Sequence, residues 1–200
     1  VALRASGMGA HVIVTEIKST AALKATNEGH VVMTMEQAAK VGDIFITATG
    51  CNDVITKKHI EKMKDGAIIC NTGHYDCEIN LEDLNKLKKS VRTIRPNCEE
   101  YTMKDGRKIY ILAKGRLVNL SAAEGHPSEV MDMSFANQFN AQLALVNAYK
   151  SGKKLDIDVH VLPESMDQDI AGVKLSTMGI KIDKLTKEQI KYNNDFSEGT

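Results

Sequence analysis

Short apolar runs alternate with amphipathic segments through the first 80 residues, and this alternation constrains the fold more than any other feature. The runs at 11–16 (HVIVTE), 31–32 (VV), 44–50 (IFITATG) and 67–70 (AIIC) have strand length, and none alternates between polar and apolar residues. Strands of this kind are buried on both faces. We therefore predict an α/β fold built on a doubly wound parallel sheet covered by helices.

The segments between these runs carry helix signals. Ser19 is expected to be the N-cap of a helix that stops at Gly29, and residues 34–37 (TMEQ) have the pattern of a capping box that opens a helix through Val41. Residues 56–63 are also expected to be helical. Each predicted strand is thus followed by a helix, as parallel pairing requires.

The pattern changes beyond Val91. Two alternating runs joined through Asp105-Gly106 predict a β-hairpin that closes the sheet, and helical spacing of apolar residues predicts a long amphipathic helix from Ser128 to Tyr149. Residues 151–200 have too few large apolar groups for a core of their own, so we expect them to pack on another subunit or domain. The long helix is expected to bury its apolar side chains in a core: Val130, Met131, Phe135, Phe139, Leu143 and Val146.

Charge and composition narrow the function. Twenty-six basic residues balance twenty-six acidic ones, so no overall field attracts the chain to nucleic acid or to a membrane. The sequence contains neither an apolar run of about 20 residues nor a signal-peptide pattern, and we expect a cytoplasmic protein. The four cysteines lack CxxC spacing and are expected to be free thiols.

Candidate binding residues lie where the predicted strands end, because ligands of open parallel sheets bind beyond the carboxyl ends of the strands. Glu16 follows the first run, Thr49, Gly50 and Cys51 follow the third, and Thr72, Gly73 and His74 follow the fourth. Glycine lets a ligand approach the backbone closely, and histidine changes its charge near neutral pH. A simple turn at Thr49-Gly50 and a structural histidine at 74 remain alternatives.

Glu16 has the most specific chemical meaning. An acid at the end of the second strand of a dinucleotide-binding unit accepts hydrogen bonds from the adenosine ribose and repels a phosphate there, which favours NAD over NADP. A solvent-exposed glutamate is the alternative. The glycine fingerprint that should precede Glu16 by about 20 residues is absent, so either the unit is of another kind or it lacks its first strand.

Two further groups of residues carry side chains that could bind a ligand. Cys70, His74 and Cys77 resemble a metal-ligand cluster, but the spacing fits no common zinc site and Cys70 lies in an apolar run, so we predict no metal. Asn119 and His126 are candidates for a polar cradle, since His126 lies in a Gly-His-Pro step just before the long helix and Asn119 lies seven residues upstream of it.

Four motifs taken in order resemble the C-terminal half of S-adenosyl-L-homocysteine hydrolases: VIVTEI, TATGCNDVI, IICNTGHYDCEI and GRLVNLSAAEGHPSEVM. The resemblance extends to LTKEQIKY and so covers essentially the whole chain. It implies a Rossmann-type NAD domain at 1–127 that lacks its first strand, a hinge helix at 128–150 and a C-terminal oligomerisation arm at 151–200.

The resemblance also implies a cytoplasmic homotetramer of one-carbon metabolism. Such an enzyme uses NAD to oxidise the ribose 3′-hydroxyl of the thioether nucleoside for the duration of one turnover, which acidifies the C4′ proton and lets homocysteine leave. Water is then added and the hydride returns. The implied substrate is S-adenosyl- or S-inosyl-L-homocysteine.

Site residues follow from the same resemblance. Glu16 is expected to hold the adenosine ribose, and Thr49, Cys51, Thr72 and Gly73 are expected to line the cofactor. The remaining three are expected to act at the nicotinamide and substrate end: Asn119 on the nicotinamide amide, His74 as both a cofactor-binding residue and the catalytic gate and polarising group beside Tyr75, and His126 at the nucleoside.

The sequence departs from the family pattern in several places. Ala21 and Ala48 stand where many members have Asn and Thr, Glu124 replaces a common Met, and the tail at 193–200 lacks the Lys and Tyr that many members lend to a neighbouring subunit. The choice between adenosine and inosine stays open. Other readings are a 2-hydroxyacid dehydrogenase and a non-catalytic nucleotide-binding regulator, and residues 1–200 alone are expected to be inactive.

Overall fold

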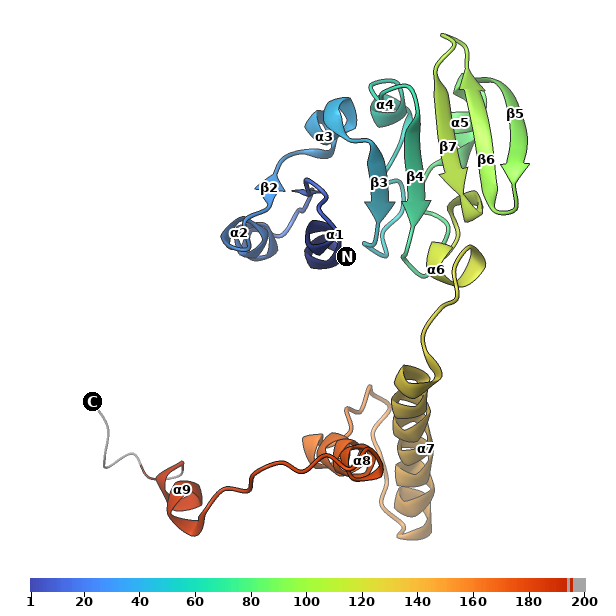
Figure 1. The fold of residues 1–200 in the computed structure, drawn as a ribbon. Coiled ribbons are helices and arrows are strands. Elements are labelled where there is room, and N and C mark those ends of the chain that lie inside the picture. Colours follow the sequence, from blue (N-terminus) through green and yellow to red (C-terminus); the bar gives the residue numbers. More distant parts are fainter. Residues whose placement is uncertain (194, 196–200) are drawn as a thin grey trace. The chain divides into compact units, whose positions relative to one another are not determined.

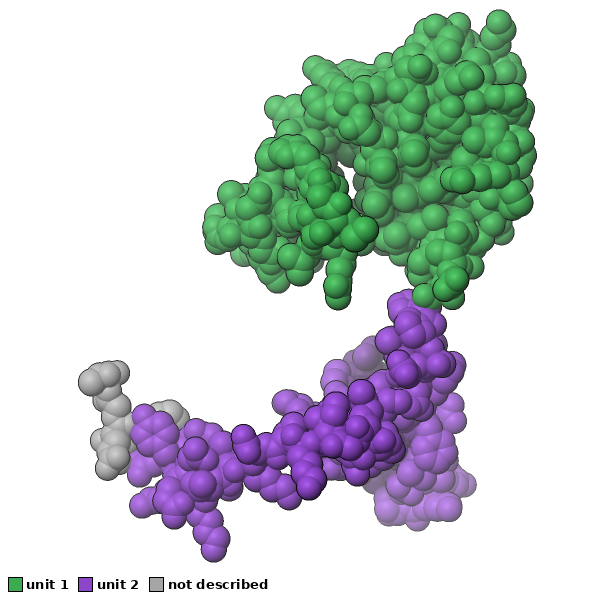
Figure 2. All heavy atoms as spheres, in the orientation of Figure 1, with its two compact units in different colours: residues 1–125 green, residues 126–200 purple. Residues whose placement is uncertain are grey.

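The computed structural model describes residues 1–193 and 195 of the 200-residue chain. It divides into two compact units, residues 1–125 and 126–200, shown in separate colours in Figure 2. Apart from Asn193 and Asp195, the divergent tail noted above lies outside the described residues.

Unit 1 alternates helices and strands as the apolar runs predict. Its helices are α1 (Ala2–Gly7), α2 (Ser19–Asn27), α3 (Met35–Val41), α4 (Lys57–Ile60), α5 (Leu81–Leu87), the 3₁₀ turn η1 (Ala113–Gly115) and α6 (Val118–Ser121). Its strands are β1 (Ile13–Val14), β2 (Val31–Val32), β3 (Ile44–Thr47), β4 (Ala67–Asn71), β5 (Lys88–Arg95), β6 (Cys98–Met103) and β7 (Lys108–Leu112).

The strands form two sheets. β1 pairs with β2 in parallel, and the larger sheet has the order β3-β4-β7-β6-β5, with β3, β4 and β7 parallel (Figure 1). Dinucleotide-binding sheets have the order 3-2-1-4-5-6. The chain reproduces this order as β2-β1 and β3-β4-β7, and the described residues place no strand between β1 and β3. The α/β fold with a predominantly parallel, Rossmann-type sheet is therefore confirmed.

One face of the larger sheet carries the core of unit 1. Helices α3, α4 and α5 pack side by side, and Ala39, Ile60 and Leu84 on them join Phe45 of β3 and Ile69 of β4 in one buried cluster. On the opposite face of β3, Ile44 and Ile46 are 62% and 43% exposed. A parallel sheet normally has both faces covered, so this apolar patch is an open part of the described structure.

The helix starts follow their capping signals with one exception. Thr34 and Gln37 form the predicted capping box of α3, and Thr56 caps α4 with His59 as its partner. The prediction for Ser19 was wrong by one residue, because Lys18 is the N-cap of α2 and Ser19 is already helical. Just before α2, the Glu16 carboxylate accepts hydrogen bonds from the backbone N–H groups of Ile17 and Lys18. The turn that leads into the helix is therefore stabilised by Glu16 and not by a serine cap.

The predicted hairpin is present. β6 and β7 pair antiparallel around a turn in which Gly106 has φ +93°, a conformation that favours glycine. β5, which the sequence did not reveal, pairs antiparallel with β6 and forms the edge of the sheet. Its sequence, KKSVRTIR, is rich in Lys and Arg, and charged residues on an edge strand discourage pairing with other chains.

Unit 2 contains α7 (Ser128–Lys150), α8 (Glu164–Thr177) and α9 (Lys187–Tyr192). The long helix is confirmed, but the expectation that its apolar residues form a core was wrong for the described chain, in which no α7 residue is buried. Phe135 and Phe139 are exposed because α8, the helix packed against α7, covers only part of its apolar surface. None of the helices in the described residues is both long and apolar enough to cross a membrane.

Candidate functional site

Three chain segments meet at the carboxyl edge of the parallel strands. Residues 48–51 follow β3, residues 72–78 follow β4, and residues 113–119 follow β7. The third segment is tied directly to β4, because Asn71 and Leu117 form a parallel bridge. Parallel strands share the edge at which they end, so the candidate residues at 49–51, 72–74 and 119 are brought to one edge.

The turn after β3 is held by its own side chain and by a carboxylate from the next segment. Thr49 donates its backbone N–H to Glu78 and its hydroxyl to Glu78 Oε2 at 2.7 Å, while the same hydroxyl oxygen accepts from the N–H of Cys51 at 3.0 Å. Gly50 has φ +70°, which explains the glycine. Thr49 and Cys51 are both exposed at this edge.

Asn71, the last residue of β4, organises the turn that follows. Its fully buried amide donates to the carbonyl oxygens of Tyr75 at 2.8 Å and Gly115 at 3.0 Å. Its Oδ1 accepts from the N–H of Gly73 at 2.6 Å and from the hydroxyl of Thr47 at 3.1 Å. One side chain therefore links β3, the turn after β4 and the turn after β7.

Thr72 and Gly73 lie in the turn that Asn71 organises. Thr72 donates its N–H to the Thr47 carbonyl at 2.8 Å, which keeps it beside β3. Gly73 leaves no room for a side chain, because a Cβ there would lie 1.8 Å from Glu78 Oε1. Both residues are half-buried, whereas the next residue, His74, is exposed.

His74 and Tyr75 project from this turn. Both side chains are exposed, and their rings meet edge to face with centroids 4.7 Å apart. The predicted role of His74 as a gate or polarising group stays a prediction.

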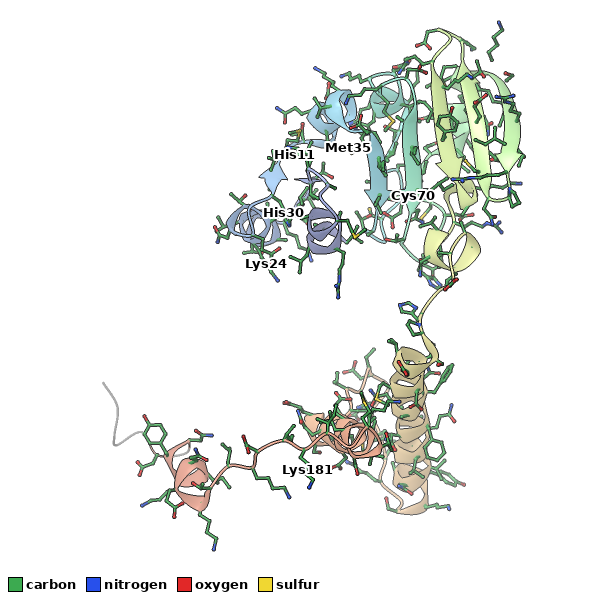
Figure 3. All side chains as sticks on the ribbon, viewed as in Figure 1. His11, Lys24, His30, Met35, Cys70 and Lys181 are labelled. Carbon is green, nitrogen blue, oxygen red and sulfur yellow. The ribbon has the colours of Figure 1, made fainter. Side chains whose placement is uncertain are left out.

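The cysteines around His74 do not form a metal site in the described structure. Cys70 is buried within β4, where Figure 3 labels it, whereas Cys77 is exposed. Burial raises the pKa of the Cys70 thiol, which disfavours the thiolate that a metal requires. Among the described residues no three His, Cys, Asp or Glu side chains group as metal ligands.

Glu16 follows β1 in the smaller sheet. Its carboxylate Oε1 accepts from the N–H groups of Ile17 at 2.7 Å and Lys18 at 3.0 Å, and the bonds from Lys18 and then Ile17 lower the pKa of this exposed group. The side chain is thus ionised and fixed through one oxygen. Within the described residues Oε2 makes no hydrogen bond, so it remains available to a ligand hydroxyl.

Asn119 and His126 have different environments. Asn119 lies in α6, and its Oδ1 is buried without a hydrogen-bond partner among the described residues. Such an orphaned acceptor in a buried position is unfavourable unless a ligand donates to it. His126 is exposed and is the first residue of unit 2, so its predicted role at the nucleoside stays a prediction.

The arginines expected of a carboxylate-binding dehydrogenase are not assembled. The Arg92 Nε donates to the nearly buried Glu100 at 2.8 Å on the β5–β6 ladder. Arg116 donates to the Ala113 carbonyl within its own turn. Neither side chain is part of a site with His74 in the described structure, which weakens the 2-hydroxyacid dehydrogenase alternative.

Comparison with known proteins gives a specific answer. The family model for the NAD-binding domain of S-adenosyl-L-homocysteine hydrolase matches residues 1–125, the same span as unit 1. The chain belongs to the S-adenosyl-L-homocysteine hydrolase family. Residues 1–125 are thus an NAD-binding domain, and the resemblance drawn from the four motifs is confirmed.

Curated relatives match along the whole chain. It is 54% identical to the S-inosyl-L-homocysteine hydrolase of Methanocaldococcus jannaschii, and 51% and 52% identical to the adenosylhomocysteinases of Sulfurisphaera tokodaii and Thermococcus kodakarensis. All 200 residues are covered in each case. The chain spans about half the length of these relatives, with 47% to 48% of each covered.

The strand-edge residues fit the chemistry of NAD in this hydrolase family. Glu16 offers an ionised oxygen that suits a ribose diol, and the unpartnered Oδ1 of Asn119 suits the N–H donors of a carboxamide. A Cβ at Gly50 would meet no atom within 4 Å, so a flat ring can approach the backbone of the turn after β3. The residues present therefore agree with the cofactor that the family binds.

Sequence reasoning passed over Asn71 and Glu78, which hold this edge together. Both lie in the IICNTGHYDCEI stretch, and both have no exposed surface. The available signal was a polar residue at the end of an apolar strand and an acid set directly before the buried Ile79. Buried polar groups are almost always hydrogen-bonded, so each indicated a network.

Proposed function

We propose that the protein carrying this chain is an NAD-dependent hydrolase that cleaves S-adenosyl- or S-inosyl-L-homocysteine reversibly to the nucleoside and L-homocysteine. The observation that carries the proposal is the match of residues 1–125 to the family's NAD-binding domain. The printed activities of the relatives support the substrate class, since they are an S-inosyl-L-homocysteine hydrolase and adenosylhomocysteinases. The chain supplies the part of that enzyme that handles the cofactor.

Each strand-edge residue has a defined task in this proposal. Glu16 binds the adenosine ribose of NAD and selects against NADP, because its charge would oppose a 2′-phosphate. Thr49, Cys51, Thr72 and Gly73 line the cofactor. Asn119 accepts the carboxamide N–H of the nicotinamide through Oδ1, the atom that the protein leaves without a partner among the described residues.

His74 acts at the boundary between cofactor and substrate. Its ring is exposed, and its only ring contact within the described residues is Tyr75, so it is free to cover or uncover the site. Bound NAD supplies reversible oxidation of the ribose 3′-hydroxyl. By covering the site while the oxidised sugar is present, His74 and Tyr75 exclude water. His126 is assigned to the nucleoside at the hinge.

We also propose a cytoplasmic homo-oligomer, a tetramer by analogy with the family. The exposed apolar side chains of α7 and α8, including Phe135, Phe139 and Val173, support association with further protein surface. Isolated units rarely expose so many large apolar groups on one pair of helices. Sedimentation of the intact protein tests the oligomeric state directly.

The activity is tested with the intact protein that carries this chain. Purified protein should release NAD on denaturation and should produce a free thiol, detected with a disulfide reagent, from S-adenosyl-L-homocysteine or S-inosyl-L-homocysteine. Supplying the two thioethers in parallel decides the base preference. Two departures from the family pattern lie next to proposed site residues: Glu124 is two residues before His126, and Ala48 directly precedes Thr49.

Two controls make the result decisive. His74→Ala should reduce turnover and weaken the retention of NAD, because the ring is assigned both to the gate and to the cofactor. His160, an exposed histidine to which no role is assigned, serves as the matched control when changed to Ala. Absence of bound NAD and of thiol release from both thioethers would refute the proposed function.

A further inference from the structure

The Glu78 carboxylate connects two of the strand-edge segments that carry the proposed cofactor site. It lies at the end of the turn after β4 and has no exposed surface. It accepts from the Thr49 N–H at 2.9 Å, the Gly50 N–H at 2.9 Å and the Thr49 hydroxyl at 2.7 Å. All three donors belong to the turn after β3, which is 28 to 29 residues away in sequence.

The electrostatics agree with an ionised acceptor. Burial raises the pKa of the Glu78 carboxyl, but the hydrogen bonds from the amides of Thr49 and Gly50 and from the Thr49 hydroxyl outweigh it, so the pKa lies below its ordinary value. Charge-assisted hydrogen bonds are shorter and stronger than neutral ones. The turn after β3 is therefore held to Glu78 by strong bonds.

The same carboxylate also shapes the turn after β4. A Cβ on Gly73 would lie 1.8 Å from Glu78 Oε1 and 2.9 Å from Asn71 Oδ1. Gly73 is absent from the glycines with positive φ, so the reason for glycine here is space and not backbone conformation. Glu78 packs directly against the backbone that carries His74.

The backbone next to Glu78 completes the connection. The Ile55 N–H donates to the Glu78 carbonyl at 3.0 Å, and Ile55 and Ile79 form a parallel bridge. Asp53, two residues before Ile55, donates its N–H to the Cys77 carbonyl at 2.9 Å. Main chain and side chain of this short stretch thus fix the segments after β3 and β4 to each other.

We propose that Glu78 is a positioning residue for cofactor binding, which acts by fixing the Thr49-Gly50 turn and the Gly73 backbone in the geometry that receives NAD. This inference rests on the proposed function for the identity of the ligand. Glu78 has no exposed surface from which to touch the cofactor, so it acts through Thr49, Gly50 and Gly73.

Three substitutions separate the acceptor from the bulk of the side chain. Glu78→Gln keeps the length and one acceptor oxygen, Glu78→Asp keeps the charge but is one methylene shorter, and Glu78→Ala removes the acceptor. Ile69→Val is the matched control, because Ile69 is fully buried in β4 and belongs to the hydrophobic cluster under the sheet, outside the turns. It lowers stability without removing a hydrogen bond from either turn.

The affinity for NAD is measured by calorimetry on the intact protein stripped of cofactor. Glu78→Ala and Glu78→Asp should weaken binding by at least about tenfold, since small displacements of binding groups have large effects. Glu78→Gln should weaken binding less than either of these, because an oxygen kept at Oε1 still accepts from both the Thr49 and the Gly50 amides while the new NH2 group faces the Thr49 N–H. Ile69→Val should bind NAD with the affinity of the wild type although its thermal stability is lowered.

Amide hydrogen exchange provides a second readout that needs no cofactor. Protection of the Thr49 and Gly50 amides should be lost in Glu78→Ala and retained in Glu78→Gln and Ile69→Val. The inference is overturned if Glu78→Ala matches Ile69→Val both in NAD affinity and in protection of these amides. If instead the wild-type protein binds no NAD, the proposed function fails and the inference fails with it. This holds even if protection of the Thr49 and Gly50 amides is lost in Glu78→Ala and retained in Glu78→Gln.

Discussion

A single-atom change at Asn71 tests whether the strand edge is held as the structure indicates. Asn71→Asp replaces the amide nitrogen by oxygen and leaves the shape of the side chain unchanged. The nitrogen donates to the carbonyl oxygens of Tyr75 and Gly115 at 2.8 and 3.0 Å. A carboxylate oxygen at that position would face the same two carbonyl oxygens without a proton between them, in a site with no exposed surface.

The expected magnitude follows from the cheapest way to avoid that repulsion, which is to bind a proton. Keeping a carboxyl of ordinary pKa near 3.9 protonated costs about 4 kcal/mol at pH 7 and about 1.5 kcal/mol at pH 5. The protonated group donates once where the amide donated twice, and one lost hydrogen bond adds about 1 kcal/mol. The free energy of unfolding should therefore fall by about 5 kcal/mol at pH 7 and by about 2.5 kcal/mol at pH 5.

The sign of the pH dependence is specific to this mechanism. The new carboxyl would have a higher pKa in the folded than in the unfolded state, so the folded state binds more protons above pH 4 and loses stability as the pH rises. Partnered carboxylates, such as Glu78 with its lowered pKa, have the opposite dependence. Relative to wild type, the variant should thus recover on acidification.

Urea unfolding followed by circular dichroism at pH 5 and pH 7 measures the difference from wild type at each pH. Asn85→Asp is the matched control, because Asn85 is exposed on α5 and the same chemical change there should stay within about 0.5 kcal/mol. A loss below about 1 kcal/mol at pH 7, or a loss that is equal at the two pH values, would show that the Asn71 amide is not buried against these carbonyls.

Three other predictions concern single groups. Burial, followed by the charge of Lys58, lowers the pKa of His59. The unfolded state therefore binds more protons than the folded state below about pH 6.5, and the melting temperature should fall as the pH is lowered through that value. His59→Gln retains a side-chain acceptor for the cap of α4, and in this variant the fall in melting temperature should be smaller. Gly73→Ala should destabilise the wild type by more than it destabilises Glu78→Ala, and additive effects in that double-mutant cycle would mean that the two residues do not touch. Glu16→Ala should weaken NAD binding and lower the ratio of the affinity for NAD to the affinity for NADP. An unchanged ratio would mean that Glu16 does not bind the adenosine ribose.

The order of elements was predictable because it depends on local patterns. Non-alternating apolar runs gave the parallel strands, the Thr34–Gln37 box gave the start of α3, and Asp105-Gly106 gave the β6–β7 hairpin. Strand lengths were less accessible, since β1 covers only Ile13–Val14 of the six-residue run that predicted it. Pairing partners decide where a strand ends, and they are distant in sequence.

The features missed from the sequence are those decided by tertiary contacts. β5 is a basic edge strand that owes its conformation to pairing with β6. The exposed Phe135 and Phe139 have helical spacing, which reports an apolar face but not what covers it. The position of Glu78 before Ile79 indicated a buried acid, but no local pattern reveals its donors, which lie 28 residues upstream.

We therefore expect the strand edge to behave as one cooperative structure and not as three independent loops. Glu78 ties the turn after β3 to the turn after β4, and Asn71 ties the turn after β4 to the turn after β7. Both linking side chains are buried, so removing either one leaves a buried donor or acceptor without a hydrogen-bond partner. A substitution at Glu78 or Asn71 should therefore lower the protection of backbone amides in segments that are distant from it in sequence. Hydrogen exchange across residues 48–51, 72–78 and 113–119 would detect that coupling directly.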